Sequence, residues 1–154
     1  AALLNSHMRE LVAIIHKFSG RVEKFIGDAI VAFFPGDSEA ACRNAIHAAA
    51  IMMKKHREIQ IERKTRNQVT YGIGIGLDYG VVMAGILHAH ARSEFTLIGP
   101  ARSNAEHCES ASKGGIATRI MATGEVACGN QAFSPLFISH ADNLFELASL
   151  ENLP

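Results

Sequence analysis

Apolar residues recur from position 3 to position 18 at the three- and four-residue spacing of an amphipathic helix. A second helix is predicted over residues 39–63, after Pro35-Gly36, with Asp37 or Ser38 as its N-cap. The first half of this second helix is rich in alanine, which permits close packing on a sheet, and its second half is charged. The stripe of the first helix consists of Leu3, Leu4, Leu11, Val12, Ile14, Ile15 and Phe18, with Gly20 after it.

Two apolar runs of β type, residues 21–26 and 29–34, flank the dipeptide Gly27-Asp28. A two-residue turn of this kind closes a β-hairpin, so the sequence predicts a hairpin here. The turn places the carboxylate of Asp28 at the tip and leaves Lys24 four residues before it. A carboxylate at a rigid tip is suited to a divalent cation, and a nearby ammonium is suited to a polar ligand.

Residues 69–77 alternate between apolar and small residues, which predicts a strand with Gly72, Gly74 and Gly76 on one face. A bare strand face marks a close approach of backbone or ligand. These glycines are not a dinucleotide fingerprint, because they follow a period of two and no helix opens after them. Further elements are predicted as strands at 81–87, 94–98, 116–122, 137–138 and 145–147, and as helices at 101–112 and within 123–129.

The order of these elements predicts an α+β fold, in which helices pack on one antiparallel-rich sheet. With 154 residues, we expect positions 1–154 to form one domain. The formal net charge is zero, which argues against a nucleic-acid partner. No apolar run reaches the roughly 20 residues that cross a bilayer, and no secretory leader is visible, so we expect a cytoplasmic location, including as part of a membrane-bound or multidomain protein.

Cysteines and histidines add little to this picture. The three cysteines lack metal-type spacing and are expected to be buried free thiols in a reducing compartment. They are Cys42, Cys108 and Cys128. Five scattered histidines are expected at the surface or at its boundary, namely His7, His16, His47, His56 and His140.

The hairpin segment, residues 20–34 (GRVEKFIGDAIVAFF), resembles the metal-binding hairpin of the class III adenylyl and guanylyl cyclases. Leu3-Leu4-Asn5 resembles the opening of the helix before that hairpin. Residues 74–85 (GIGLDYGVVMAG) resemble the central strand pair of the family, and residues 92–99 (RSEFTLIG) resemble the strand with its base-reading residue. The resemblance implies a ferredoxin-like core with added strands and the formation of a 3′,5′-cyclic nucleotide from a nucleoside triphosphate.

The reaction of that family is an in-line attack of the ribose 3′ oxygen on the α-phosphorus, with loss of pyrophosphate. Two divalent cations, Mg²⁺ or Mn²⁺, are held by two aspartates, of which the second matches Asp28. The first aspartate of the family lies on a strand ahead of the first helix. The 154 residues start inside that helix, so we expect this strand to lie outside them.

Base recognition is implied at Lys24 and Thr96. Lys24 stands where adenylyl cyclases carry a lysine that donates to adenine N1, and it suits the protonated N1 of guanine poorly. Thr96 matches the partner position of a subgroup in which a threonine hydroxyl accepts from the adenine amino group. The alternative is that both are ordinary sheet residues, with Lys24 solvated and Thr96 favoured by its β-branched side chain.

The chain departs from the family in the next helix. Ser103 and His107 stand where the family has the asparagine that orients the ribose and the arginine that stabilises charge on the α-phosphate. Arg102 and Asn104 flank the first of these positions, but one residue along a helix turns a side chain by about 100°. A neutral histidine is a poor substitute for a forked, always-charged guanidinium. The triphosphate-binding lysine of the family has no match within residues 133–147, and Pro100 replaces its usual aspartate.

Two classes of function therefore stay open. The domain could be a cyclase that converts ATP to cyclic AMP, with Ser103 and His107 in altered roles, or one with a preference for GTP or a pyrimidine nucleotide. It could instead be a degenerate module that binds nucleotide or dimerises without turnover. The resemblance also implies a head-to-tail homodimer whose two sites each use both chains, and a sensor or regulatory domain outside this chain.

Overall fold

The structure is a computed structural model that describes residues 2–154, with side chains from Leu4 onward. The side chain of Leu3, which the sequence places in the first apolar stripe, lies outside the described residues. Helix α1 (Ala2–Lys17) buries Leu11 and Ile15 and ends at Lys17. Ser19, two residues later, has a left-handed φ of 64°. None of the described helices is both long enough and apolar enough to cross a membrane.

The predicted hairpin is present with the predicted turn. Strand β1 (Arg21–Ile26) pairs antiparallel with β2 (Ala29–Phe33), and Ile26 lies opposite Ala29 across Gly27-Asp28. Gly27 has a φ of 59°, which a residue with a side chain adopts at a cost. A bulge in β1 shifts the register between Val22 and Lys24. The bulge sets the direction of the intervening side chain, Glu23.

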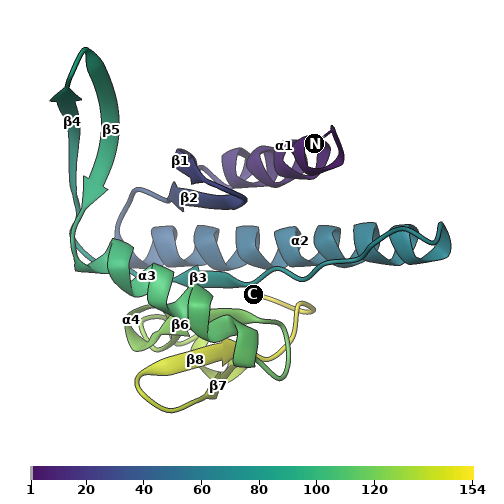
Figure 1. Cartoon of the computed structure of the whole chain (residues 1–154). Coiled ribbons are helices and arrows are strands. Elements are labelled where there is room, and N and C mark those ends of the chain that lie inside the picture. Colours follow the sequence, from purple (N-terminus) through teal and green to yellow (C-terminus); the bar gives the residue numbers. More distant parts are fainter. Residues whose placement is uncertain (1) are drawn as a thin grey trace.

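Helix α2 (Ser38–Thr65) is the longest element and crosses the molecule (Figure 1). Its N-cap is Asp37, whose carboxylate accepts a hydrogen bond of 2.9 Å from the amide of Ala40. The alanine-rich half packs into the core as predicted. The buried apolar side chains that α2 contributes are Ala41, Cys42, Ile46, Ala48, Ala49, Ala50 and Met53.

A four-stranded sheet with the order β3-β6-β8-β7 forms the other side of this core. Strands β3 and β6 are parallel, and the β6–β8 and β7–β8 pairs are antiparallel. Ile120, Ala122 and Leu147 of the sheet meet α2 in one apolar cluster. The strands are β3 (Ile75–Leu77), β6 (Ile120–Thr123), β7 (Phe137–Ser139) and β8 (Leu144–Leu147).

Helix α3 (Pro100–Ala111) lies against β3 and β6. Gly76 in β3 and Gly74 just before this strand explain how the helix comes so close. A Cβ atom on Gly74 would overlap the Ser112 side chain, and one on Gly76 would overlap the α3 backbone. The glycine pattern therefore serves helix packing. Short helical turns complete the fold: α4 (Gly124–Ala127), η1 (Ser112–Gly114) and η2 (Ser134–Leu136).

A second hairpin projects from the body of the molecule, as Figure 1 shows. It consists of β4 (Met83–Ala89) and β5 (Arg92–Ile98), and we call it the arm. Every residue of β4 is exposed. Large apolar side chains that the arm and its root expose are Val81, Met83, Ile86, Leu87, Phe95 and Ile98.

The α+β prediction is confirmed, with antiparallel pairs in the majority, but the strands form three separate sheets where the sequence suggested one. Two strands are also shorter than predicted. Side chains of α2 engage the backbone before β3, since Arg63 donates to the Val69 carbonyl and Gln60 accepts from the Tyr71 amide. The amides at 116, 117 and 119 donate to the Glu146 carboxylate, so β6 begins only at Ile120.

Two expectations about single residues were wrong. Cys128 is exposed, whereas Cys42 and Cys108 are buried as predicted, and burial raises the pKa of each buried thiol to about 11. His7 and His56 are buried rather than superficial, with 4% and 5% of their surfaces exposed. They face each other between α1 and α2, where helix packing removes them from water.

Candidate functional site

The ammonium of Lys24 is the centre of a polar cluster at the root of the arm. It donates to the Glu94 carboxylate at 2.7 Å and to the Thr96 hydroxyl at 3.3 Å. We call Lys24, Glu94 and Thr96 the lysine cluster. The hydrogen bond to Glu94 raises the pKa of Lys24, and the same bond lowers the pKa of Glu94. Both groups are therefore ionised at neutral pH, and the predicted neighbours Lys24 and Thr96 do meet within one chain.

A buried carboxylate holds this cluster in place. The Glu23 side chain is 0% exposed and lies 3.5 Å from the Lys24 ammonium. It accepts a hydrogen bond of 3.3 Å from the Leu97 amide of β5 and one of 3.1 Å from Nε of Arg102 on α3. Glu23 thus links the three elements that carry Lys24, Thr96 and the altered helix positions. The bulge in β1 makes this possible, because it turns the Glu23 side chain inward next to a lysine that stays at the surface.

Asp28 stands alone at the tip of the first hairpin. Its side chain is exposed, and it takes part in none of the hydrogen bonds or ion pairs found among the described residues. A single carboxylate is a suitable oxygen donor for Mg²⁺ or Mn²⁺ but is not a site. Across residues 2–154 no three His, Cys, Asp or Glu side chains gather in a way that could hold a metal ion. The described residues of one chain therefore do not complete a cation site.

Ser103 and His107 lie one helical turn apart on α3, and both are exposed. Their neighbours are already engaged. Arg102 is held by Glu23 and by Glu106, the latter at 2.7 Å. Asn104 donates at 3.0 Å to Asp78, which also accepts from the Thr123 hydroxyl. Neither Arg102 nor Asn104 is therefore free to replace the residues that the family has at 103 and 107.

Sequence reasoning missed Glu23 and Glu94. Glu94 could have been found, because it precedes Thr96 by two residues and strand alternation places both on one face. Glu23 could not have been found in this way, because regular alternation would put Glu23 and Lys24 on opposite faces and only the bulge brings both to the cluster.

A second polar cluster lies between α1 and α2 and consists of His7, His56 and Tyr71, which we call the histidine cluster. The two imidazole rings stack with centroids 5.3 Å apart, and Nδ1 of His7 lies 2.7 Å from the Tyr71 hydroxyl. Nε2 of His7 and Nδ1 of His56 have no hydrogen-bond partner among the described residues. Burial lowers the pKa of His7, and burial followed by repulsion from His7 lowers that of His56 to about 4.

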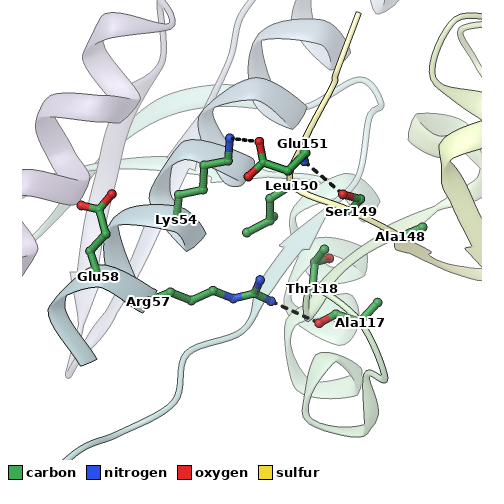
Figure 2. Close-up of a pocket in the computed structure, with 9 residues that line it drawn as sticks. All are labelled: Lys54, Arg57, Glu58, Ala117, Thr118, Ala148, Ser149, Leu150 and Glu151. Carbon is green, nitrogen blue, oxygen red and sulfur yellow. Dashed lines mark hydrogen bonds and ion pairs between the residues drawn. The ribbon is translucent and has the colours of Figure 1, made fainter. Parts of the chain in front are cut away.

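The pocket in Figure 2 lies away from the lysine cluster and has a volume of about 400 Å³. Its polar groups are largely engaged with each other. Lys54 pairs with Glu151 at 3.0 Å, and Arg57 donates to the Ala117 carbonyl at 3.2 Å. None of the predicted site residues lines it.

These observations agree with comparisons with known proteins. Residues 1–135 match the family model described as the adenylate and guanylate cyclase catalytic domain. The chain belongs to this family. The class III resemblance is thereby confirmed.

Among curated relatives, the chain is 32% identical over 114 residues to an adenylate cyclase of Anabaena cylindrica and 34% identical over 107 residues to the terminal-differentiation-specific adenylate cyclase of Dictyostelium discoideum. These matches cover 71% and 69% of the chain, but only 22% and 5% of the relatives. A solved bacterial light-regulated adenylyl cyclase shares the fold, with a TM-score of 0.77 and 25% identity over 95% of this chain and 44% of that one. Guanylyl cyclase domains of lower identity also share the fold, and one of them is described as dimeric.

Proposed function

We propose that this cyclase domain converts ATP to 3′,5′-cyclic AMP and pyrophosphate. The observation that carries the proposal is the contact between Lys24 and Thr96, which come from distant parts of the chain. An ammonium donor beside a hydroxyl acceptor complements the N1 acceptor and the amino donor on the edge of adenine. An ordinary solvated lysine on a strand would not need to be held by Glu23, Glu94 and Thr96.

The site would be shared between two copies of the chain. Asp28 projects from an exposed turn, and the arm exposes apolar side chains beside Lys24 and Thr96, as expected for surfaces that a partner covers. In this homodimer, Asp28 of one copy would join the lysine cluster and α3 of the other. A sensor or regulatory domain outside the chain would control how the copies meet.

Metal ions would complete the site only with a second carboxylate, which we place on the strand that the family has ahead of α1. Bound Mg²⁺ or Mn²⁺ would activate the ribose 3′ oxygen and stabilise the leaving pyrophosphate. The residues of this chain have the remaining tasks. Lys24 and Thr96 would bind the base, and Ser103 and His107, both exposed on α3, would act on the ribose and on the α-phosphate. Because histidine lacks the fixed charge of arginine, we expect slow turnover.

The decisive experiment measures cyclic AMP formation by the full-length protein with ATP and either Mg²⁺ or Mn²⁺. Asp28→Asn should lower the rate by about a hundredfold or more, because the carboxylate is lost as a metal ligand. Asp142→Asn is the matched control, since Asp142 is also an exposed turn aspartate and asparagine tolerates its φ of 59°. This control should keep the full rate.

Binding of ATP to the lysine cluster without any product would favour the alternative, a degenerate module. Equal rates for Asp28→Asn and the unaltered protein would remove Asp28 from the site. In either case the membership of the family stands, and only the proposed chemistry fails.

A further inference from the structure

Charged side chains form a continuous network from the arm to α3. Each cation in it lies between two carboxylates, and successive N···O distances are 2.7, 3.5, 3.1 and 2.7 Å. The central carboxylate, that of Glu23, is 0% exposed, whereas the two outer carboxylates are 62% and 54% exposed. The network therefore links the lysine cluster to the helix that carries Ser103 and His107. In order, its members are Glu94, Lys24, Glu23, Arg102 and Glu106.

Within this network, the Glu23 carboxylate spans the turn between β5 and α3. One of its oxygens accepts a hydrogen bond of 3.3 Å from the Leu97 amide and lies 3.4 Å from Nε of Arg102, and the other accepts from the same Nε at 3.1 Å. Leu97 directly follows Thr96, and Arg102 directly precedes Ser103. A single buried carboxylate thus fixes the start of α3 relative to the end of β5. It thereby sets where Ser103 lies relative to Thr96.

The first turn of α3 has no comparable link to these strands. Gly99 precedes the helix, and no side-chain hydrogen bond caps it. Asn104 donates to Asp78, which follows β3 rather than β5. Among the described residues, Arg102 is the one in this turn whose side chain is bonded to β1 and, through the Glu23 carboxylate, to β5.

An arginine suits this position because two of its nitrogens act at once. Nε donates to the buried Glu23, while Nη1 donates at 2.7 Å to Glu106, one helical turn later. The guanidinium is planar and rigid, so these two contacts also fix the orientation of the Arg102 side chain. A lysine would keep the positive charge beside Glu23, but it offers a single nitrogen on a flexible stem and cannot hold both carboxylates in the same geometry.

We propose that Arg102 is a positioning residue for the cyclase reaction. Bound to Glu23, it keeps α3 at the distance from the lysine cluster that lets Ser103 and His107 meet the ribose and the α-phosphate of the same nucleotide. Arg102 acts through Glu23 and does not touch the nucleotide itself. The inference rests on the proposed cyclase function. Because a misplacement of about 1 Å can lower a rate by about a hundredfold, loss of this link should affect turnover more than base binding.

The test compares Arg102→Lys with the unaltered full-length protein. The steady-state kcat and KM for ATP are measured with Mn²⁺, and binding of an α,β-methylene ATP analogue is measured calorimetrically. Hydrogen exchange with and without the analogue shows whether the bound nucleotide protects the amides of β5 and of α3. Arg43→Lys is the matched control, because Arg43 is also a helical arginine with a carboxylate one turn away, Glu39 at 3.2 Å. Urea unfolding verifies that each variant is folded under the assay conditions.

In Arg102→Lys, kcat should fall about tenfold or more, while KM and the affinity for the analogue change less than about threefold, because the lysine cluster still holds the base. The analogue should protect both β5 and α3 in the unaltered protein, but only β5 in Arg102→Lys. Glu23→Gln, which replaces the carboxylate by a neutral amide, should lower kcat by a similar factor. Combining the two changes should lower kcat no further than either alone, because residues that act as a unit give non-additive losses. Arg43→Lys should leave every value unchanged.

An unchanged kcat in Arg102→Lys would overturn the inference. So would a rise in KM as large as the fall in kcat, which would place Arg102 in the base pocket, or additive losses in the double variant, which would show that the two residues act separately. Failure of the unaltered protein to bind the analogue would overturn both this inference and the proposed function. If no nucleotide gave a cyclic product but the loss of protection in α3 persisted, the proposed turnover would be refuted and Arg102 would remain a positioning residue.

Discussion

The lysine cluster and the histidine cluster are both polar groups held by packed elements, yet their surroundings are opposite. In the lysine cluster, Lys24 and Glu94 carry full charges, each has a partner, and both reach solvent. In the histidine cluster, the two imidazoles are buried, lack partners on two ring nitrogens and are favoured in the neutral form.

Because of this difference, we expect the polar side chains of one cluster to affect ligand binding and those of the other to affect stability. Exposed and charged groups at the lysine cluster cost the fold little, so changing them should alter ligand binding more than stability. Buried groups at the histidine cluster depend on their protonation state, so changing them should alter stability more than binding. Changing Glu23 should alter both stability and binding, because its side chain is fully buried and also contacts Lys24.

Glu23→Ala should therefore have the largest effect on folding. The substitution leaves the partly buried Arg102 guanidinium and the Leu97 amide without their acceptor, and removal of one partner from such a pair costs about 3 kcal/mol. Urea unfolding at pH 7.5 measures this loss. Glu106→Ala is the control, because it removes the exposed carboxylate on the same guanidinium and should cost about 0.5 kcal/mol or less. Equal losses for the two variants would show that Glu23 is not the anchor of the cluster.

The histidine cluster should make stability depend on pH. A histidine whose pKa is lowered on folding contributes stability that is complete above its ordinary pKa of about 6.5 and is lost as the pH falls toward the folded value. For His56 that window runs from about 6.5 down to about 4, which amounts to a loss on the order of 2 kcal/mol by pH 5. Nearby charges contribute as well, since Glu10 favours protonation of His7 while Arg57 and Arg119 disfavour that of His56.

Urea unfolding at pH 7.5 and at pH 5.0 tests this dependence. His56→Phe keeps an aromatic ring against His7 but cannot be protonated, so its stability should change by at least 1 kcal/mol less between the two pH values, on the order of half of the His56 contribution. His16→Gln, at an exposed histidine, should keep the full dependence. An identical pH dependence in the protein with and without His56 would contradict the assignment.

Local sequence patterns predicted the helices and strands well. The features that these patterns did not predict depend on contacts between residues far apart in the sequence. The first hairpin follows from Gly27-Asp28 between two apolar runs, and the cap of α2 follows from Asp37, because both are decided by neighbouring residues. The burial of His7 and His56 is decided by how α1 crosses α2 and by Tyr71 from a distant loop. No periodicity in either helix specifies that crossing.

In the candidate site, too, some residues could be predicted from the sequence and others only from the packing. The pairing of Lys24 with Thr96 spans 72 positions, so hydrophobic patterns alone could not have found it, and only the resemblance to a family implied it. The same resemblance pointed to Ser103 and His107 and gave no reason to consider Glu94. The commitment of Arg102 and Asn104 to other partners required the packing of α3 against β1 and β3.

A substitution that increases activity would test the role proposed for the exposed face of α3. His107→Arg restores a forked and permanently charged group on an exposed face of α3, so kcat for cyclic AMP should rise about tenfold with no loss of stability. Steady-state kinetics with ATP and Mn²⁺ provide the measurement. His16→Arg, at another exposed helical histidine, is the control and should leave kcat unchanged. An unchanged or lower kcat in His107→Arg would place residue 107 away from the phosphates.

The smallest effect is expected from Tyr71→Phe, inside the histidine cluster. The change removes the hydroxyl on Nδ1 of His7, whose Nε2 has no partner among the described residues, while the phenyl ring keeps the aromatic packing. Loss of one partly buried, neutral hydrogen bond should lower the free energy of unfolding by about 1 kcal/mol. Tyr79→Phe, which loses a hydrogen bond of 3.2 Å to the Gly36 carbonyl at an exposed position, should cost about half as much or less.

Cyclase activity should be unchanged in both tyrosine variants, because neither tyrosine contacts the lysine cluster. If Tyr71→Phe lowered activity as strongly as it lowered stability, the two clusters would be coupled, and the separation of folding and binding roles would be wrong.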